Sequence, residues 1–167
     1  MKMASSAEWF IEGDELLALI RERLAAGQTV RYLPFRGVSM MPMLRQGKDT
    51  VEIAPLPEKL QKYDLPVYQY PSGKVVMHRI VDVKDDYYVC LGDNTYSYEK
   101  ITPDMLIGKV TAFKRGDKRI EVTDSAYCRY VRIWVAIYPL RKAFRPFVRT
   151  VKNILRPILK PILRRFR

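Results

Sequence analysis

The sequence contains a single histidine and only two cysteines among its 167 residues. Cys90 and Cys128 are too few for a disulfide framework, and one imidazole with two thiols does not make up the usual ligand set of a zinc site. We therefore expect no bound metal and no other cofactor. Any chemistry that needs an imidazole must use His78.

Long apolar runs are also missing. No stretch approaches the ~20 apolar residues that a membrane-spanning helix needs, and the longest uncharged apolar run near the C-terminus covers only residues 133–140. The first residues do not have the basic and then apolar pattern of an export signal, because acidic residues interrupt them from Glu8 onward. These features predict a cytoplasmic protein.

Acidic residues are absent from residues 125–167. The rest of the chain has equal numbers of basic and acidic residues, so the net charge of +12 belongs to this C-terminal part. Between positions 144 and 166 apolar residues recur every three or four positions, which indicates a basic amphipathic helix that prolines divide. We expect residues 141–167 to bind an anionic membrane surface, with packing on the body as the alternative. Specific nucleic acid binding is not expected, because no aromatic stacking surface or known motif accompanies the charge.

The other two parts of the chain differ in their apolar pattern. Residues 5–26 have serines to cap a helix, an apolar side and a glycine stop, which predicts an amphipathic N-terminal helix within residues 1–27. Residues 28–124 consist of short runs rich in valine, isoleucine and tyrosine between turn sequences. This pattern predicts an all-β body, so that the chain as a whole is mainly β. Strands are expected at residues 29–36, 49–54, 65–70, 74–83, 86–91, 106–114 and 118–123.

Three short stretches of this body carry groups that hydrolytic chemistry requires. A serine hydroxyl is a weak nucleophile and needs a base within hydrogen-bond reach, together with an acid that orients the base. Ser39 lies in a turn of small residues, and His78 lies in a strand-like run. Asp93 follows another strand in a Gly-Asp-Asn turn, from which its carboxylate is a candidate to hold the imidazole.

The order of these motifs resembles a known family. Gly-x-Ser-Met-x-Pro-x-Leu at 37–44, His-Arg-Ile-Val at 78–81, Gly-Asp-Asn at 92–94 and Ile-Gly-Lys-Val at 107–110 resemble the peptidase core of type I signal peptidases. The matching branch pairs serine with histidine rather than with lysine. The resemblance covers about residues 30–115. It implies the all-β peptidase body that signal peptidases share with LexA-like proteins.

The resemblance also implies catalytic roles. Ser39 would attack the scissile carbonyl and offer its own backbone amide to the oxyanion, and His78 would act as the general base. Asp93 would orient the imidazole, with Glu99 as the alternative acid.

The turn around the serine would shape the substrate cleft through Met40 and Pro42. Gly37 stands where bacterial relatives often have a hydroxyl residue that stabilises the oxyanion, so a second oxyanion donor is not identified. Signal peptidases are normally anchored by a membrane-spanning helix before the serine, whereas here we expect no such segment.

The expected function is a signal-peptidase-like serine endopeptidase that removes a leader or propeptide from a peptide or preprotein substrate. We expect it in the cytoplasm, soluble or peripheral at the inner face of the membrane. Two alternatives remain: a LexA-like self-cleaving regulator with the same fold, and a non-catalytic β-domain that binds membrane or nucleic acid. Because the general base works as a neutral imidazole, activity would rise as the pH passes the range in which histidine loses its proton.

Overall fold

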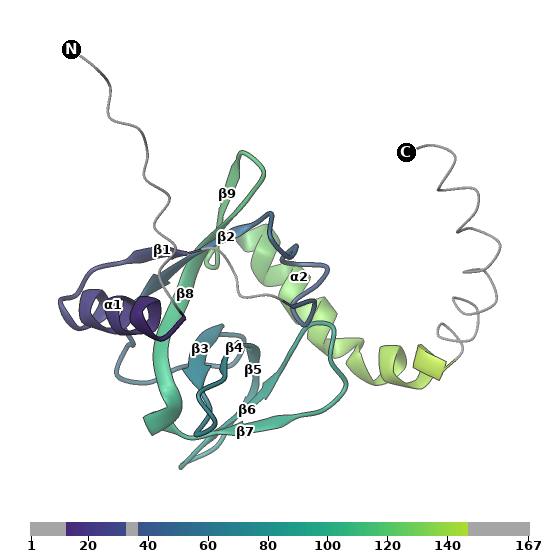
Figure 1. Cartoon of the computed structure of the whole chain (residues 1–167). Helices are drawn as coiled ribbons and strands as arrows, with labels where there is room; N and C mark the ends of the chain where they lie inside the picture. The colour runs from purple at the N-terminus through teal and green to yellow at the C-terminus, as the bar shows by residue number, and fades with distance from the viewer. Residues whose placement is uncertain (1–12, 33–36, 147–167) are drawn as a thin grey trace, which may run out of the picture.

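The computed structural model describes residues 13–32 and 37–146 (Figure 1). Residues 5–12 of the predicted N-terminal helix, the end of the first predicted strand and residues 147–167 lie outside this part of the chain. The elements are α1 (Gly13–Ala25), β1 (Val30–Tyr32), β2 (Thr50–Ala54), β3 (Pro66–Gln69), β4 (Val75–Met77), β5 (Arg79–Val83), β6 (Tyr88–Leu91), β7 (Glu99–Ile101), the 3-10 helix η1 (Pro103–Met105), β8 (Leu106–Arg115), β9 (Lys118–Glu121) and α2 (Ser125–Ala136).

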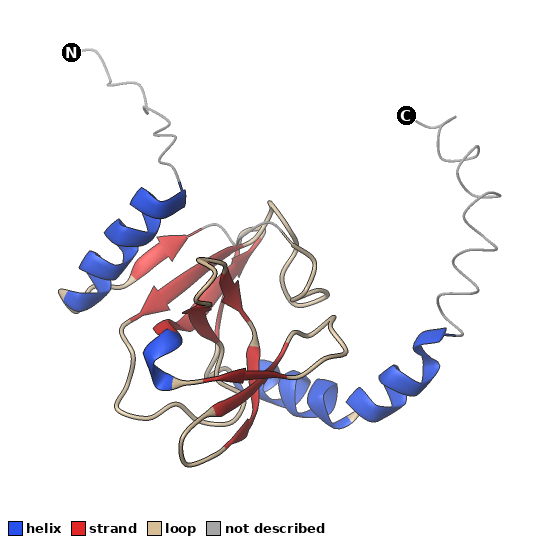
Figure 2. Cartoon of the chain, turned by 60° about the horizontal axis from the view of Figure 1, so that its bottom comes forward, coloured by secondary structure: helices blue, strands red, loops and turns tan. Residues whose placement is uncertain are grey.

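The body is mainly β and consists of two antiparallel sheets, with α1 and α2 at its two ends (Figures 1 and 2). The larger sheet has the order β1-β2-β8-β3-β4, and β9 pairs with β8; the smaller sheet has the order β5-β6-β7. Register shifts where β8 pairs with β2 and with β3 bend these strands, as β-bulges do. The structure thus confirms the mainly β body.

The strand predicted at 74–83 is in fact two strands in different sheets. Val75 to Met77 pair with β3, whereas Arg79 to Val83 pair with β6. The backbone amide of Ile80 donates to the carbonyl of Asp64 at 2.9 Å, so the chain leaves the first sheet where it passes this loop. His78 is the residue at the junction, and the larger sheet ends beside it.

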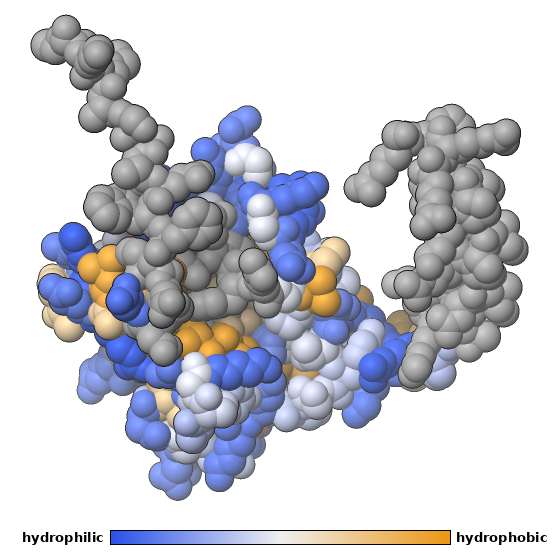
Figure 3. Space-filling view, viewed as in Figure 1, coloured by the Kyte–Doolittle hydropathy of each residue, from blue (hydrophilic) through white to orange (hydrophobic). Residues whose placement is uncertain are grey.

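Three apolar clusters fill the described part of the body. The larger cluster lies between α1, the larger sheet, the 40–44 turn and α2, and the smaller cluster joins the two sheets around Tyr68, Ile80 and Cys90. A third cluster consists of Val81, Leu91 and Tyr138. Gly108 lets α1 approach the sheet, because a Cβ there would lie 2.6 Å from Ile53 Cγ2 and 2.9 Å from Leu24 Cδ1. The face of the molecule in Figure 3 is mostly hydrophilic, with small separate hydrophobic areas.

The C-terminal helix begins in the basic part of the chain and packs on the body. Tyr127, Val131 and Tyr138 are buried, and residues 138–146 are again helical after a break at Ile137. Pro139 lacks a backbone amide, which accounts for the break. Within residues 13–32 and 37–146, no helix is long and apolar enough to cross a bilayer.

We expect Cys90 to resist alkylation in the folded protein. Its side chain is completely buried, and burial together with the nearby charge of Glu99 raises the pKa of its thiol to about 12. Because the thiolate is the reactive form, iodoacetamide at pH 8 should modify Cys90 at least about a thousandfold more slowly than an exposed cysteine. Peptide mapping by mass spectrometry, with and without urea, measures this. Modification of native Cys90 at the rate seen in urea would contradict the packing of the smaller cluster.

Candidate active site

Buried side chains and a backbone hydrogen bond fix the turn that carries Ser39. Met40, Met43 and Leu44 are buried in the larger cluster, and the amide of Leu44 donates to the carbonyl of Met40 at 2.9 Å. The Met41–Pro42 peptide bond is cis. Ser39 itself is only partly buried, so its hydroxyl stays accessible while its neighbours anchor the backbone.

The Gly-Asp-Asn turn holds the same segment through hydrogen bonds from Asn94. The Asn94 amide donates to the carbonyl oxygen of Ser39 at 2.7 Å, and its side-chain Nδ2 donates to that of Val38 at 3.1 Å. The first and third sequence motifs of the resemblance are therefore in direct contact.

The imidazole of His78 is buried against a carboxylate and a phenol. Its Nδ1 lies 2.7 Å from Glu99 Oε2 and 3.2 Å from the hydroxyl of Tyr68, which donates to the same Glu99 oxygen. A carboxylate only accepts hydrogen bonds, so Nδ1 carries a proton and donates it to Glu99. In the neutral ring this leaves Nε2 as the acceptor.

Glu99 is ionised at neutral pH. Burial by itself would raise its pKa, but hydrogen bonds from His78 and Tyr68 and the charge of His78 hold the pKa below its usual 4.5. Burial and the Glu99 carboxylate raise the pKa of Tyr68 far above its usual value, so the phenol remains a donor. The arrangement fixes the direction of each hydrogen bond around Nδ1.

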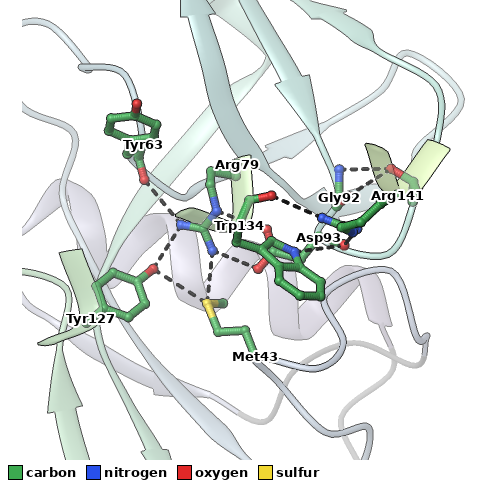
Figure 4. Close-up of polar contacts among 9 residues, drawn as sticks. Met43, Tyr63, Arg79, Gly92, Asp93, Tyr127, Trp134 and Arg141 are labelled. Carbon is green, nitrogen blue, oxygen red and sulfur yellow. Dashed lines mark hydrogen bonds and ion pairs between the residues drawn. The ribbon is translucent and has the colours of Figure 1, made fainter. Parts of the chain in front are cut away.

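Among residues 13–32 and 37–146, no hydrogen bond or ion pair joins Asp93 to His78, which corrects the expectation that Asp93 orients the imidazole. Its two carboxylate oxygens accept from Arg79 Nε at 2.9 Å and from Arg79 Nη2 at 2.8 Å (Figure 4). Arg79 follows His78 directly in the chain, but the two side chains have different acidic partners. Arg79 pairs with Asp93, and His78 pairs with Glu99. The acid on the histidine is Glu99, which was the alternative.

Ser39, His78 and Glu99 line one pocket of about 300 Å³. Gly37 and Met40 line it too, whereas Pro42 lines a separate cavity of about 240 Å³ with Met43 and Tyr127. Pro42 therefore shapes the turn but not this pocket. Among the described residues, no hydrogen bond joins the Ser39 hydroxyl to the imidazole, and no three His, Cys, Asp or Glu side chains group closely enough to hold a metal ion.

Gly92 brings the serine turn and the imidazole close together. A Cβ on Gly92 would lie 2.9 Å from His78 Nε2 and 2.9 Å from the carbonyl oxygen of Ser39. Both distances are too short for a real side chain. Because Gly92 has no side chain, the Nε2 atom of His78 and the Ser39 segment can both lie close to it.

Replacing Gly92 with alanine is expected to displace the imidazole or the serine turn, at a cost of about 1–3 kcal/mol in the free energy of unfolding. If Ser39 of the wild type reacts with an active-serine probe, the Gly92→Ala variant should lose that reaction as well. The matched control is Gly73→Ala, in an exposed turn where φ is +84°. It should cost about 1–2 kcal/mol through backbone strain alone and leave the pocket unchanged. Equal reactivity of the two variants would contradict this role of Gly92.

Several residues around this site were not singled out in the sequence. Tyr68 gave no signal, because a tyrosine in a strand is ordinary. Arg79 donates from Nη1 to the hydroxyl of Tyr127 at 2.9 Å, while the carbonyl of Asp93 accepts from Trp134 Nε1 at 3.0 Å and from Arg141 Nη2 (Figure 4). An arginine next to the only histidine, inside an apolar run, was the one available hint that its charge needs a buried partner.

The Glu99 contact should appear in the pH dependence of stability. Because the pKa of Glu99 is lower in the folded protein than its usual 4.5, the unfolded chain binds the proton more readily. The stabilisation is complete above this value and is lost as the pH falls through the lowered pKa. In Glu99→Gln the free energy of unfolding should therefore fall less steeply below pH 4.5 than in the wild type. Urea denaturation over this range measures the slopes, and exposed Glu58→Gln should keep the wild-type slope. Parallel slopes for Glu99→Gln and wild type would contradict the contact.

Comparison with protein-family models, with curated proteins and with solved structures finds no match for this chain.

Proposed function

We propose that the protein is a signal-peptidase-like serine endopeptidase with Ser39 as nucleophile, His78 as general base and Glu99 as the residue that orients the base. The observation that carries the proposal is that all three line one pocket, with Glu99 on Nδ1 and Nε2 left as the acceptor beside the Ser39 turn. A buried imidazole with one nitrogen fixed by a carboxylate is what activation of a serine requires.

In this mechanism Ser39 Oγ forms a bond to the scissile carbonyl carbon and gives its proton to His78 Nε2. The carboxylate of Glu99 stabilises the resulting imidazolium through Nδ1. The Ser39 amide makes no hydrogen bond among the described residues, which leaves it available to the oxyanion. The imidazolium then protonates the leaving amine as the peptide bond breaks, and water releases the acyl group by the same steps.

The substrate in this proposal is an extended peptide, such as a leader or propeptide. β4 is the last strand of the larger sheet, and its residues Val75, Val76 and Met77 line the pocket up to His78. A peptide that adds to a free strand edge gains backbone hydrogen bonds regardless of its side chains. Such binding would place the scissile bond between β4 and the Ser39 turn.

We also propose a cytoplasmic location with peripheral attachment to the inner face of the membrane. This part rests on the absence of acidic residues after Asp124 and on the basic composition of residues 125–167. The LexA-like alternative predicts that the purified chain cuts itself. The non-catalytic alternative predicts a pocket in which Ser39 has no unusual reactivity.

The test is labelling with a peptidyl phosphonate, followed by intact-mass measurement and mapping of the adduct. Wild type and Ser72→Ala, which changes an exposed turn serine, should be labelled once, on Ser39. Ser39→Ala and His78→Ala should not react. Labelling of Ser39→Ala, or no reaction of the folded wild type, would count against the peptidase. Cleavage of the chain during incubation alone would favour the LexA-like alternative.

A further inference from the structure

The outward side of the C-terminal helix carries a row of exposed apolar side chains. Ile133, Ile137, Leu140 and Phe144 form this outer row, and their exposed fractions are 55%, 36%, 59% and 56%. Spacings of four, three and four residues place them on one side of a helix. Amides of residues 137 and 141 donate to carbonyls four residues earlier, so the helical path continues past the break.

The fold does not need this row, because the inward side of the same helix already packs on the body. Tyr127, Val131 and Tyr138 are buried there, and Tyr138 stacks on the ring of Tyr96 with centroids 6.3 Å apart. The helix therefore has apolar side chains on two sides, of which only one is covered by described residues. Four large exposed apolar side chains in line are typical of an interaction surface.

The charge on this helix limits what can cover the outer row. Residues 125–146 contain no acidic residue, and Arg129, Arg132, Lys142 and Arg145 are exposed. A second copy of the chain would bring these cations against each other. A nucleic acid would match the charge but would leave the apolar row in water. An anionic lipid surface accepts both, because apolar side chains enter the interface while cations meet the headgroups.

We propose that the outer row is a docking face for an anionic lipid surface. This deepens the membrane attachment proposed above and does not depend on the peptidase chemistry. It assigns the contact to residues 133–144, most of which precede the segment 141–167 that the sequence favoured.

The docking face is tied to the candidate active site. Trp134 Nε1 donates to the carbonyl of Asp93 at 3.0 Å, and Arg141 donates to the same oxygen while its guanidinium lies 3.8 Å from the Trp134 ring. Asp93 lies between Gly92 and Asn94, which contact the Ser39 segment. A helix that lies on lipid would therefore hold the pocket at a set orientation to the membrane, which suits a substrate peptide presented at that surface.

The experiment places an environment-sensitive nitrobenzoxadiazole label at one position of the full chain. Leu140→Cys carries the label in a Cys128→Ser background, where Cys90 is buried; Ser72→Cys, in an exposed turn of the body, is the matched control. With vesicles of phosphatidylglycerol and phosphatidylcholine, emission at position 140 should rise and shift to the blue. Vesicles of phosphatidylcholine alone should give no change, and the label at position 72 should respond to neither.

Variants then test the row itself. Ile133→Gln with Phe144→Gln should weaken the vesicle response at position 140 on the order of tenfold. Leu19→Gln with Leu56→Gln removes two exposed leucines elsewhere and should leave it unchanged. Ser39→Ala should bind vesicles as wild type does, so loss of the peptidase proposal would not affect this result. A label at position 140 that stays in water while the protein sediments with vesicles would overturn the proposal. A shift that depends on protein concentration without lipid, or on duplex DNA, would overturn it too.

Discussion

Replacing Asp93 with alanine is expected to lower the free energy of unfolding by about 3–5 kcal/mol. Arg79 is completely buried, and its guanidinium would lose both hydrogen bonds from Nε and Nη2 to a carboxylate. Such a loss is a large part of the 5–15 kcal/mol that stabilises a typical domain. Chemical denaturation of the purified variant measures the change.

The magnitude follows from the surroundings of the guanidinium. Burial disfavours the charged form of Arg79, but the charge of Asp93 and its hydrogen bonds raise the pKa of the arginine above its usual value. The hydroxyl of Tyr127, the carbonyl of Tyr63 and the sulfur of Met43 accept its remaining hydrogen bonds (Figure 4). None of these neutral groups replaces a carboxylate, so the variant leaves an uncompensated charge in the core.

Asp82→Ala is the matched control for the Asp93 variant. Asp82 pairs with Lys84 at 2.7 Å, but about half of each side chain is exposed. Loss of this exposed pair should change the free energy of unfolding by less than about 1 kcal/mol. If Asp93→Ala proved as stable as this control yet failed to react with the phosphonate, Asp93 would have the catalytic role first expected from its motif.

Elements that depend only on residues close together in the chain could be predicted from the sequence. Alternation of apolar residues and turn sequences predicted most strands of the body, and six of the seven predicted segments correspond to single strands or their described parts. The exception is the segment around His78, where the chain changes sheets. That change depends on Asp64 and Asp93, which are far away in the sequence, so no local pattern reports it.

The choice between the two acids could not be predicted for the same reason. Glu99 begins β7 opposite Cys90 of β6, a pairing that turns its side chain towards Tyr68 and His78. β7 was missed because three residues with two charges do not form an apolar pattern. Asp93 is nearer than Glu99 to Cys90 in the sequence, but the carboxylate of Asp93 accepts hydrogen bonds from Arg79 instead of from His78. Sheet pairing and a buried ion pair, rather than motif order, decide which carboxylate meets the imidazole.

Glu99→Gln is expected to lower the rate of phosphonate inactivation about a hundred- to ten-thousandfold, since the carboxylate that fixes the imidazole and stabilises its protonated form is lost. The new side-chain amide can either accept a hydrogen bond from Nδ1 or donate one from its NH₂ group, and donation would favour the other tautomer of the imidazole. The neutral variant therefore neither fixes the tautomer of His78 nor stabilises its protonated form as a carboxylate does. Stopped time courses with excess phosphonate give the rate constants, and exposed Glu58→Gln is the control.

The stability of the same variants separates orientation from folding. Glu99 is partly exposed, whereas Asp93 is buried with a guanidinium, so Glu99→Gln should lose reactivity at a smaller cost in the free energy of unfolding than Asp93→Ala. Tyr68→Phe removes only the second donor to Glu99 and should slow inactivation by about tenfold, the effect of one lost hydrogen bond of about 1.4 kcal/mol. Wild-type reactivity in Glu99→Gln, with the fold intact, would mean that the histidine works without its carboxylate. The contact at Nδ1 would then be a feature of packing alone.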